Sequence, residues 1–374
     1  MTTRIAISSR PPIAMLALLA LTAGASAQST AIFSNARLAD LADPGLSTGV
    51  LTASGVMPPA SKRWSELQTL SNTGANAITG FSVHDDDHGY RLADDFTVTS
   101  PWYIDEIVVY AFVTGAGSTN PFTGANFQIW SGQPGLASST VRFGDATTNR
   151  LSSAVATDML RVFSTATISG ATAPTLPTTD RTIWELRLSV SPPLSLRTGT
   201  FWIDWQAITA PGVAAFSPAI TPLGQRVRTT GPASNARQLR LAEPPVLADT
   251  WLLINDPGKP ATAPDLAQEL AFVLRGVALP APCNAADIAN DAGEPINNPS
   301  APPNPMIANN GVTEGDYNAF FSGFFDAMAW CDIADDTGTP LPPFNGAATP
   351  NVNNGVTEAD YNLFFSIFFD GCSF

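Results

Sequence analysis

Oxygen-bearing residues recur at matching positions in two stretches near the C-terminus. Calcium loops of the EF-hand type take oxygen ligands from alternating positions and end on a carboxylate that opens the following helix. Two sets of residues follow this order: Asp287, Asn309, Gly311, Thr313 and Asp316 in the first stretch, and Asp332, Asn353, Gly355, Thr357 and Asp360 in the second. Each glycine would contribute its backbone carbonyl. The sequence therefore predicts two Ca²⁺ sites.

The first half of each predicted loop is interrupted. Alanine occupies the third loop position in both stretches, as Ala289 and Ala334, and offers no side-chain oxygen. A calcium loop has one residue between its third and fifth positions, but the first stretch has 19 and the second has 18. Two interpretations stay open. In one, Asp316 and Asp360 act only as helix caps. In the other, nearby side chains supply the missing oxygens: Asn290, Asp291, Asp335 or Asp336.

The two stretches belong to an internal repeat. Residues 309–326 read NNGVTEGDYNAFFSGFFD and residues 353–370 read NNGVTEADYNLFFSIFFD, with 15 of 18 positions identical. Each threonine is a good N-cap for a helix, with an aspartate three residues later. The following apolar residues keep helical spacing and form one stripe in each copy: Tyr317, Phe320, Phe321, Phe324, Phe325 and Met328, then Tyr361, Phe364, Phe365, Phe368 and Phe369. We expect this stripe to be mainly the core of a helix pair, with an exposed partner surface as the alternative and part of the stripe at a rim in either case.

The C-terminal region resembles a dockerin, and most closely the planctomycete-type version. The resemblance rests on the repeat, on Cys-Asn-Ala-Ala-Asp at residues 283–287 and on Gly-Cys at residues 371–372. It implies an all-α, paired EF-hand-like module over residues 283–374. It also implies attachment to a cohesin-like or other envelope or surface protein, with Ca²⁺ as the cofactor.

Three cysteines constrain the module's covalent structure. An odd number allows at most one internal disulfide. Cys283 and Cys372 bracket the repeat, so we favour that pair, which would join the two ends of a small domain. Cys331–Cys372 is the alternative.

Charge and composition indicate an exported protein. Residues 1–27 have the features of a signal peptide: arginines, a short apolar run and an Ala-Ser-Ala cleavage site. The net charge of −14 disfavours nucleic acid as a partner, and residues 283–374 hold 12 acidic residues and no Lys or Arg. No later apolar run is long enough to span a bilayer. We therefore expect a secreted or cell-surface protein with no transmembrane segment in the mature chain.

The long middle region is predicted to be mainly β. Short runs rich in β-branched and aromatic residues alternate with Gly, Pro, Ser and Thr clusters, which is typical of a jelly-roll-like β-sandwich. We assign it to residues 28–277, followed by a linker at 278–282, and expect one short helix near residues 64–70. The predicted strands are 96–99, 103–113, 127–130, 182–190, 200–209, 251–254 and 270–277. Segments such as RLADDFTV and GTFWIDW resemble a family of uncharacterised secreted bacterial β-sandwich proteins, which implies surface display.

Two clusters in this region could bind a ligand. The first is His84, Asp85, Asp86, Asp87 and His88, a metal-site candidate whose alternative is a polar surface loop. The second is the outward face of the predicted strand at 200–209, with Trp202, Asp204 and Gln206 beside a possible Glu185 and Arg187. An aromatic ring next to carboxylate and amide groups could hold a sugar; the alternative is ordinary strand residues under a loop.

No catalytic motif is present, such as a nucleophile elbow or a zinc-protease helix. A glycosidase with paired carboxylates stays open, because sequence does not place Asp85, Asp94, Asp105, Glu106, Glu185 and Asp204 in space. The predicted function is a non-enzymatic, surface- or scaffold-anchored protein. The alternative is a β-sandwich that binds or cleaves polysaccharide and is carried by a dockerin.

Overall fold

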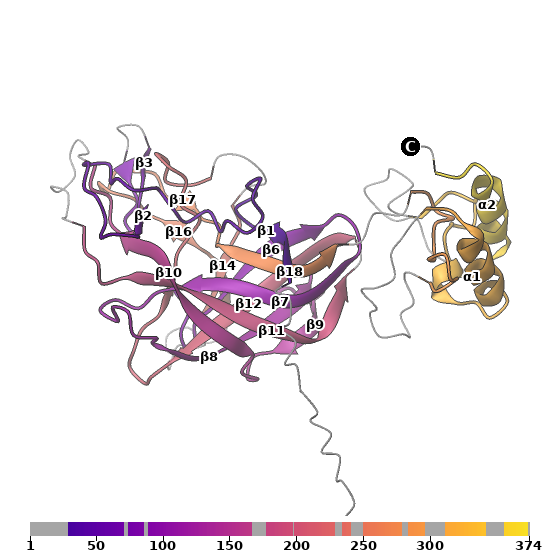
Figure 1. Cartoon of the computed structure of the whole chain (residues 1–374), viewed down its shortest axis with the longest axis horizontal. Coiled ribbons are helices and arrows are strands. Elements are labelled where there is room, and N and C mark those ends of the chain that lie inside the picture. The colour runs from indigo at the N-terminus through magenta and orange to yellow at the C-terminus, as the bar shows by residue number, and fades with distance from the viewer. Residues whose placement is uncertain are drawn as a thin grey trace, which may run out of the picture.

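The computed structural model describes most of the chain between residues 29 and 372. The described ranges are 29–70, 74–85, 89–166, 177–196, 198–228, 234–240, 250–278, 283–295, 311–341 and 355–372. The predicted signal peptide and residues 279–282 of the predicted linker lie outside them. Within these ranges the protein is mainly β, with two short α-helices near the C-terminus (Figure 1).

Two curled six-stranded sheets form the β region. The first sheet has the order β1 (Thr30–Ser34), β18 (Phe272–Ala278), β7 (Trp102–Ala111), β11 (Thr182–Leu196), β10 (Leu151–Val162) and β2 (Arg63–Glu66). The second has the order β15 (Thr250–Leu253), β14 (Arg237–Arg240), β6 (Arg91–Val98), β12 (Gly199–Thr209), β8 (Phe122–Ser131) and β9 (Thr140–Asp145). All neighbouring strands are antiparallel except β10 and β2, which are parallel.

Three two-stranded pairs accompany the sheets. They are β3 (Thr69–Leu70) with β4 (Gly74–Ala75), β5 (Phe81–Ser82) with β13 (Phe216–Ser217), and β16 (Asn255–Asp256) with β17 (Leu266–Ala267).

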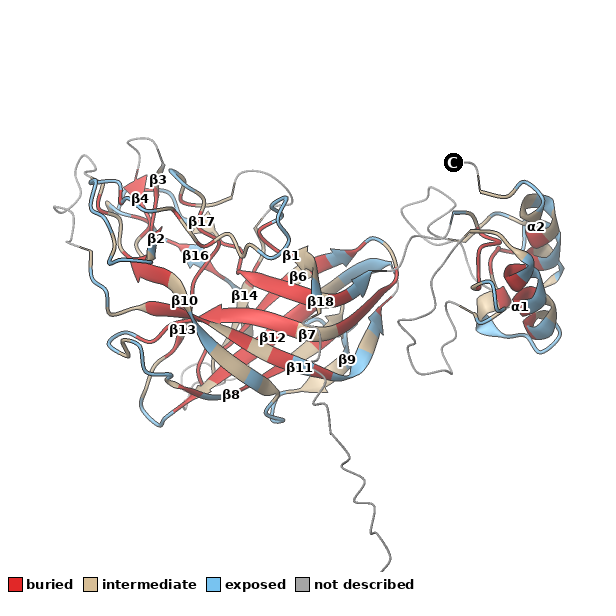
Figure 2. Cartoon of the chain, in the orientation of Figure 1, coloured by how far each residue is buried: buried red, intermediate tan, exposed pale blue. Residues whose placement is uncertain are grey.

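The apolar faces of both six-stranded sheets contribute to one core. Trp184, Leu186 and Leu188 of β11 belong to the same buried cluster as Ile203 and Trp205 of β12. The predicted alternation of these two strands is therefore confirmed, because one side chain in two points to the core. Buried residues concentrate along the central strands of each sheet (Figure 2).

Several sequence expectations need correction. The short helix expected near residues 64–70 is wrong: the segment forms β2 and β3, and β2 gains backbone partners by pairing with β10. Strands β9 and β10 were not predicted. β10 reads LSSAVATDMLRV and is partly exposed over most of its length, so it lacks the apolar alternation that marks a strand in sequence.

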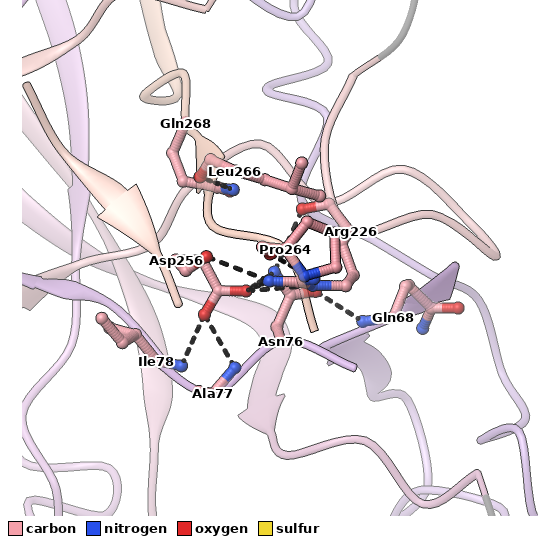
Figure 3. Close-up of polar contacts among 9 residues, drawn as sticks. All are labelled: Gln68, Asn76, Ala77, Ile78, Arg226, Asp256, Pro264, Leu266 and Gln268. Atoms are coloured by element: carbon pink, nitrogen blue, oxygen red, sulfur yellow. Dashed lines mark hydrogen bonds and ion pairs between the residues drawn. The ribbon is translucent and has the colours of Figure 1, made fainter. Parts of the chain in front are cut away.

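A buried ion pair joins segments from distant parts of the chain (Figure 3). The guanidinium of Arg226 donates to the carboxylate of Asp256, with Nη2 and Oδ2 at 2.8 Å, and both residues are about 1% exposed. The second carboxylate oxygen of Asp256 accepts backbone N–H groups of Ala77 and Ile78 at 2.7 and 3.0 Å. Asn76 Nδ2 adds a further bond to Asp256. These contacts join the short strand β16, which contains Asp256, to residues 76–78 and to Arg226.

Helix α1 (Glu314–Phe324) and helix α2 (Glu358–Phe368) form in the two repeat copies, as predicted. Thr313 and Thr357 are their N-caps, each in a capping box with the aspartate three residues later. A single 3₁₀ turn, η1 (Ala329–Cys331), follows α1.

Loss of the Asp256 carboxylate should destabilise the β region strongly. We expect Asp256→Ala to lower the free energy of unfolding by about 3–5 kcal/mol, because Arg226 would stay buried without its counter-charge. Denaturant unfolding followed by tryptophan fluorescence measures this, since seven of the eight tryptophans lie in residues 28–277.

Asp158→Ala is the matched control. Asp158 pairs with Arg63 at 2.7 Å, but both side chains are more than 40% exposed. Such a pair contributes about 0–1 kcal/mol. An equal loss of stability in the two variants would contradict the structural role assigned to Asp256.

Candidate functional sites

Asp316 and Asp360 each join the start of a helix to a distant backbone segment. In Asp316, Oδ1 accepts the backbone N–H groups of Ile288 and Ala289 at 2.6 and 2.7 Å. Its Oδ2 accepts the backbone N–H of Thr313 at 2.7 Å and lies 3.3 Å from the Thr313 hydroxyl. Asp360 makes the same contacts with Ile333, Ala334 and Thr357. Both carboxylates are fully buried.

This geometry does not fit the carboxylates as calcium ligands. A bidentate calcium ligand needs both oxygens free to face the ion, but here both oxygens of each aspartate accept hydrogen bonds from protein donors. Burial raises the pKa of Asp316, while its bonds from Thr313, Ala289 and Ile288 act in the opposite direction. The cap interpretation of Asp316 and Asp360 therefore has the structural support, and Ca²⁺ binding stays a prediction.

Among the other predicted ligands, Asp287 is buried, at 3% exposed. Asp287 Oδ2 accepts the backbone N–H of Cys283 at 2.9 Å. Gly311 and Gly355 have left-handed backbone angles, with φ of +91° and +82°. Each lies five positions before its aspartate, whereas the left-handed residue of a calcium loop lies six before. Asn309 and Asn353 lie outside the described residues.

A disulfide joins Cys283 to Cys372, which confirms the favoured pairing. Hydrogen bonds near the disulfide also join the first and last residues of the module. Asn284 Nδ2 donates to the backbone carbonyl of Gly371 at 3.0 Å, and the Val312 N–H donates to Cys372 Sγ at 3.3 Å. The two sulfur atoms and an Asp287 oxygen lie within 4.8 Å of one another. The disulfide leaves these sulfurs unavailable as thiolate metal ligands.

The two helices pack through aromatic rings in an antiparallel pair. Phe320 of α1 stacks on Phe364 of α2, with ring centroids 4.0 Å apart and planes inclined by 11°. At the two ends, Tyr317 contacts Phe368 at 5.8 Å and Tyr361 contacts Phe324 at 5.6 Å. Each repeat copy thus makes the same contacts to the other, which produces approximate two-fold symmetry. The core interpretation of the stripe holds for Phe320 and Phe364, which are at most 1% exposed.

The stripe does not stay buried to its end. Phe325 and Phe369 are 79% and 78% exposed, because the helices end at Phe324 and Phe368 and these two residues are the C-caps. Met328, Tyr317 and Tyr361 are also exposed, by 36–38%. Phe325 and Met328 therefore belong to the rim that was expected for part of the stripe. Symmetry places one exposed phenylalanine at each end of the helix pair.

Two of the mismatches between the repeat copies have a steric cause. A Cβ at Gly315 would lie 1.8 Å from the backbone oxygen of Asn290. A Cβ at Gly323 would lie 2.5 Å from Nε1 of Trp330 and 2.9 Å from Sγ of Cys331. The first copy therefore needs glycine where the second has Ala359 and Ile367.

The histidine and aspartate cluster is only partly described. His84 is 7% exposed, its Nδ1 lies 3.1 Å from the carbonyl of Ala215, and its ring lies between Tyr90 and Phe216. Asp85 is exposed. Asp86, Asp87 and His88 lie outside the described residues. A metal site at this cluster stays a prediction, and His84 faces inward rather than toward a surface loop.

Trp202, Asp204 and Gln206 do face outward from the second sheet, but they are buried there. Their exposed fractions are 6%, 0% and 7%. Glu185 and Arg187 are not beside them, because β11 belongs to the first sheet, where these two residues form an ion pair of 2.6 Å. A polar network surrounds Asp204, and only Gln206 of the three lines an open groove on this face.

Two of the carboxylates considered for catalysis, Asp94 and Asp204, are fully buried. Asp94 and Glu269 both accept hydrogen bonds from Asn35 Nδ2, at 2.8 and 3.2 Å, but they are 0% and 3% exposed. Burial and the neighbouring Glu269 raise the pKa of Asp94. Glu106 and Glu185 lie on the first sheet and face arginines. A general acid must reach its substrate, and Asp94 is closed off from solvent.

Sequence reasoning missed several exposed or groove-lining residues. Phe325 and Phe369 were named as part of the helical stripe, but the sequence did not show that they would be its most exposed phenylalanines. Trp130 and Gln128 lay in the predicted strand at 127–130, but nothing in the sequence showed which neighbours they would meet.

Within the described ranges, neither helix has the length and apolar content needed to cross a bilayer.

The Cys331 thiol should be unreactive in the folded protein. Cys331 is fully buried, and burial with the nearby Asp360 charge raises its pKa to about 12. Because the thiolate is the reactive form, we expect negligible alkylation by N-ethylmaleimide at about pH 7–9 until the protein is denatured. Mass spectrometry of the alkylated chain measures this. Full labelling of the native protein would contradict the assigned burial.

Gly315→Ala should open the C-terminal module more readily than Ala359→Gly. The new Cβ at residue 315 would collide with the Asn290 carbonyl, and overpacking of this kind costs roughly 1–3 kcal/mol. Ala359→Gly, the reverse change at the equivalent position, should cost no more than about 1 kcal/mol. The alkylation rate of Cys331 reports opening in both variants. Equal rates would rule out the steric explanation of this mismatch.

Comparisons with known proteins gave no match. No protein-family model matches the chain, and no curated protein or solved structure matches it significantly. The functional interpretation therefore rests on the residues and their geometry.

Proposed function

We propose that the protein is an exported, non-enzymatic display protein that is attached to a cell surface or scaffold by its C-terminal module. In this proposal residues 28–277 form a jelly-roll-type β-sandwich and residues 283–374 form a dockerin-like module. The module binds a cohesin-like or other envelope protein. The exposure of Phe325 and Phe369, 79% and 78%, is the observation that carries the proposal.

Two equivalent phenylalanines on the surface of a small module favour a binding role. Burial of a phenylalanine side chain contributes roughly 1.5–3 kcal/mol, so a fold that leaves two of them in water forgoes this stabilisation unless a partner covers them. Aromatic residues in such positions are frequent binding hot spots. Tyr317 and Tyr361, each on the same helix pair and more than a third exposed, extend the apolar surface.

Charge indicates the chemistry of the partner surface. Residues 283–374 carry 12 acidic side chains and no Lys or Arg. A surface of this charge repels acidic partners and attracts basic ones. We therefore expect the partner to offer apolar pockets for the phenylalanines and a basic rim around them.

In this proposal attachment does not require Ca²⁺. In a calcium-dependent module the ion would hold the loop to the helix start. Here the backbone N–H groups of Ile288 and Ala289 donate to Asp316, and these bonds and their equivalents at Asp360 already make that connection. The disulfide adds a second closure that needs no metal.

The test measures binding of the full chain to washed envelope fractions from the producing cells. We expect saturable binding that Phe325→Ser combined with Phe369→Ser weakens by at least roughly 30-fold, equivalent to a hot-spot loss of about 2 kcal/mol. Binding in calcium should equal binding in EDTA.

Leu223→Ser is the control, because Leu223 is 73% exposed and lies in the β region. It should bind as the unmodified protein does. Unchanged binding by the double phenylalanine variant would refute attachment through these residues, and loss of binding in EDTA would refute calcium independence.

A further inference from the structure

An open groove of about 780 Å³ lies on the outer face of the second sheet. Two tryptophans line it, Trp130 of β8 and Trp251 of β15, together with Gln128, Gln206 and Arg91 from the strands between and beside them. Ligand sites in proteins combine apolar and aromatic walls with a few placed polar groups in this range of volume. The groove has that composition.

The floor of the groove is an electrically neutral, pre-arranged network. Arg91 Nε donates to Asp204 Oδ1 at 2.6 Å, and its Nη2 pairs with the same oxygen. Arg91 Nη1 donates to Asn126 Oδ1, and Trp130 Nε1 donates to Asp204 Oδ2. Burial raises the pKa of Asp204, and Arg91 opposes that shift. Because the Asp204 charge offsets that of Arg91, the floor does not favour an anionic ligand.

Several polar groups at this surface remain available for a ligand. The Gln128 amide and the Trp251 indole N–H have no hydrogen-bond partner among the described residues. A guanidinium has five N–H donors, and three of those in Arg91 are used in the contacts above. Arg91 is only 5% exposed and yet lines the groove. The amides and N–H donors suit hydroxyl groups, and the exposed Asp85 carboxylate, which also lines the groove, disfavours an anionic ligand.

The groove has the breadth for a chain-like ligand. Trp130 and Trp251 stand on strands four spacings apart in the sheet order, which is at most about 19 Å at roughly 4.8 Å per strand. The loop after β8 forms one wall: Leu136 lines the groove, and Gly135 approaches Trp251 so closely that a Cβ there would lie 2.8 Å from its Cδ1. The loop contact helps fix the position of the Trp251 ring.

We propose that this groove binds a neutral polysaccharide chain. The tryptophan rings pack against the apolar faces of sugar units, and Gln128, Gln206 and Arg91 hydrogen-bond to their hydroxyls. The site is independent of the C-terminal phenylalanines and does not rest on the attachment proposal. Of the three residues noticed in the sequence, Gln206 lines the groove, Asp204 holds Arg91 and Trp130 from below, and Trp202 does not line the groove.

Affinity electrophoresis of the full chain tests the proposal. The gels contain one soluble polysaccharide each: hydroxyethylcellulose, xylan, galactomannan or laminarin as neutral probes, and polygalacturonate as the anionic probe. We expect at least one neutral probe to retard the protein, with the dissociation constant raised at least about 10-fold by Trp251→Ala and by Gln128→Ala. Leu223→Ala, a change of an exposed residue outside the groove, should leave retardation unchanged.

The outcomes separate this site from the attachment surface. Retardation by a neutral probe that Trp251→Ala and Gln128→Ala weaken, but Phe325→Ser does not, supports the groove. Retardation by polygalacturonate alone, or by no probe, overturns the proposal. Retardation that both groove variants retain also overturns it. Gln128→Ala removes only an amide at a partly exposed position, so its loss of binding cannot be attributed to misfolding when the thermal unfolding midpoint is unchanged.

Discussion

The structure depends on buried carboxylates that must each be surrounded by donors. A charged group removed from water is costly unless hydrogen bonds or a counter-charge replace its hydration. Asp204, Asp256, Asp316 and Asp360 are all at most 1% exposed, and each accepts bonds from segments far apart in the sequence. Only 13% of the chain is charged. The protein uses part of that small number inside, where each carboxylate holds two or more segments in register.

The same constraint accounts for the contacts of the aspartates that end the two predicted calcium loops. A carboxylate has about four lone-pair sites for hydrogen bonds. In each copy one oxygen accepts the backbone N–H groups of an Ile-Ala pair, and the other accepts from the N-cap threonine. The long insertions are compatible with this arrangement, because the hydrogen bonds need only the two ends of each stretch to meet.

Two surfaces are not used by the internal contacts of the buried carboxylates. The helix pair leaves Phe325 and Phe369 in water at symmetric positions, and the second sheet presents a tryptophan-lined groove above the charge-balanced Arg91 and Asp204 pair. A protein that is displayed on a surface and also holds a polysaccharide would need two separate sites of this kind. The groove uses strands of one sheet, and the attachment surface uses only the repeat.

Local patterns in the sequence determined much of this protein. The capping boxes at Thr313 and Thr357, the helices that follow them and the inward faces of β11 and β12 were predicted, because each depends on neighbouring residues or on a simple period. The Cys283–Cys372 bond was favoured because the two cysteines bracket the repeat. Only the tertiary structure decided the rest. It separated Glu185 and Arg187 from Trp202 by placing them on different sheets, turned Asp316 toward the backbone and brought Trp251 to the groove of Trp130. These outcomes depend on which strands become neighbours, and local periodicity does not contain that information.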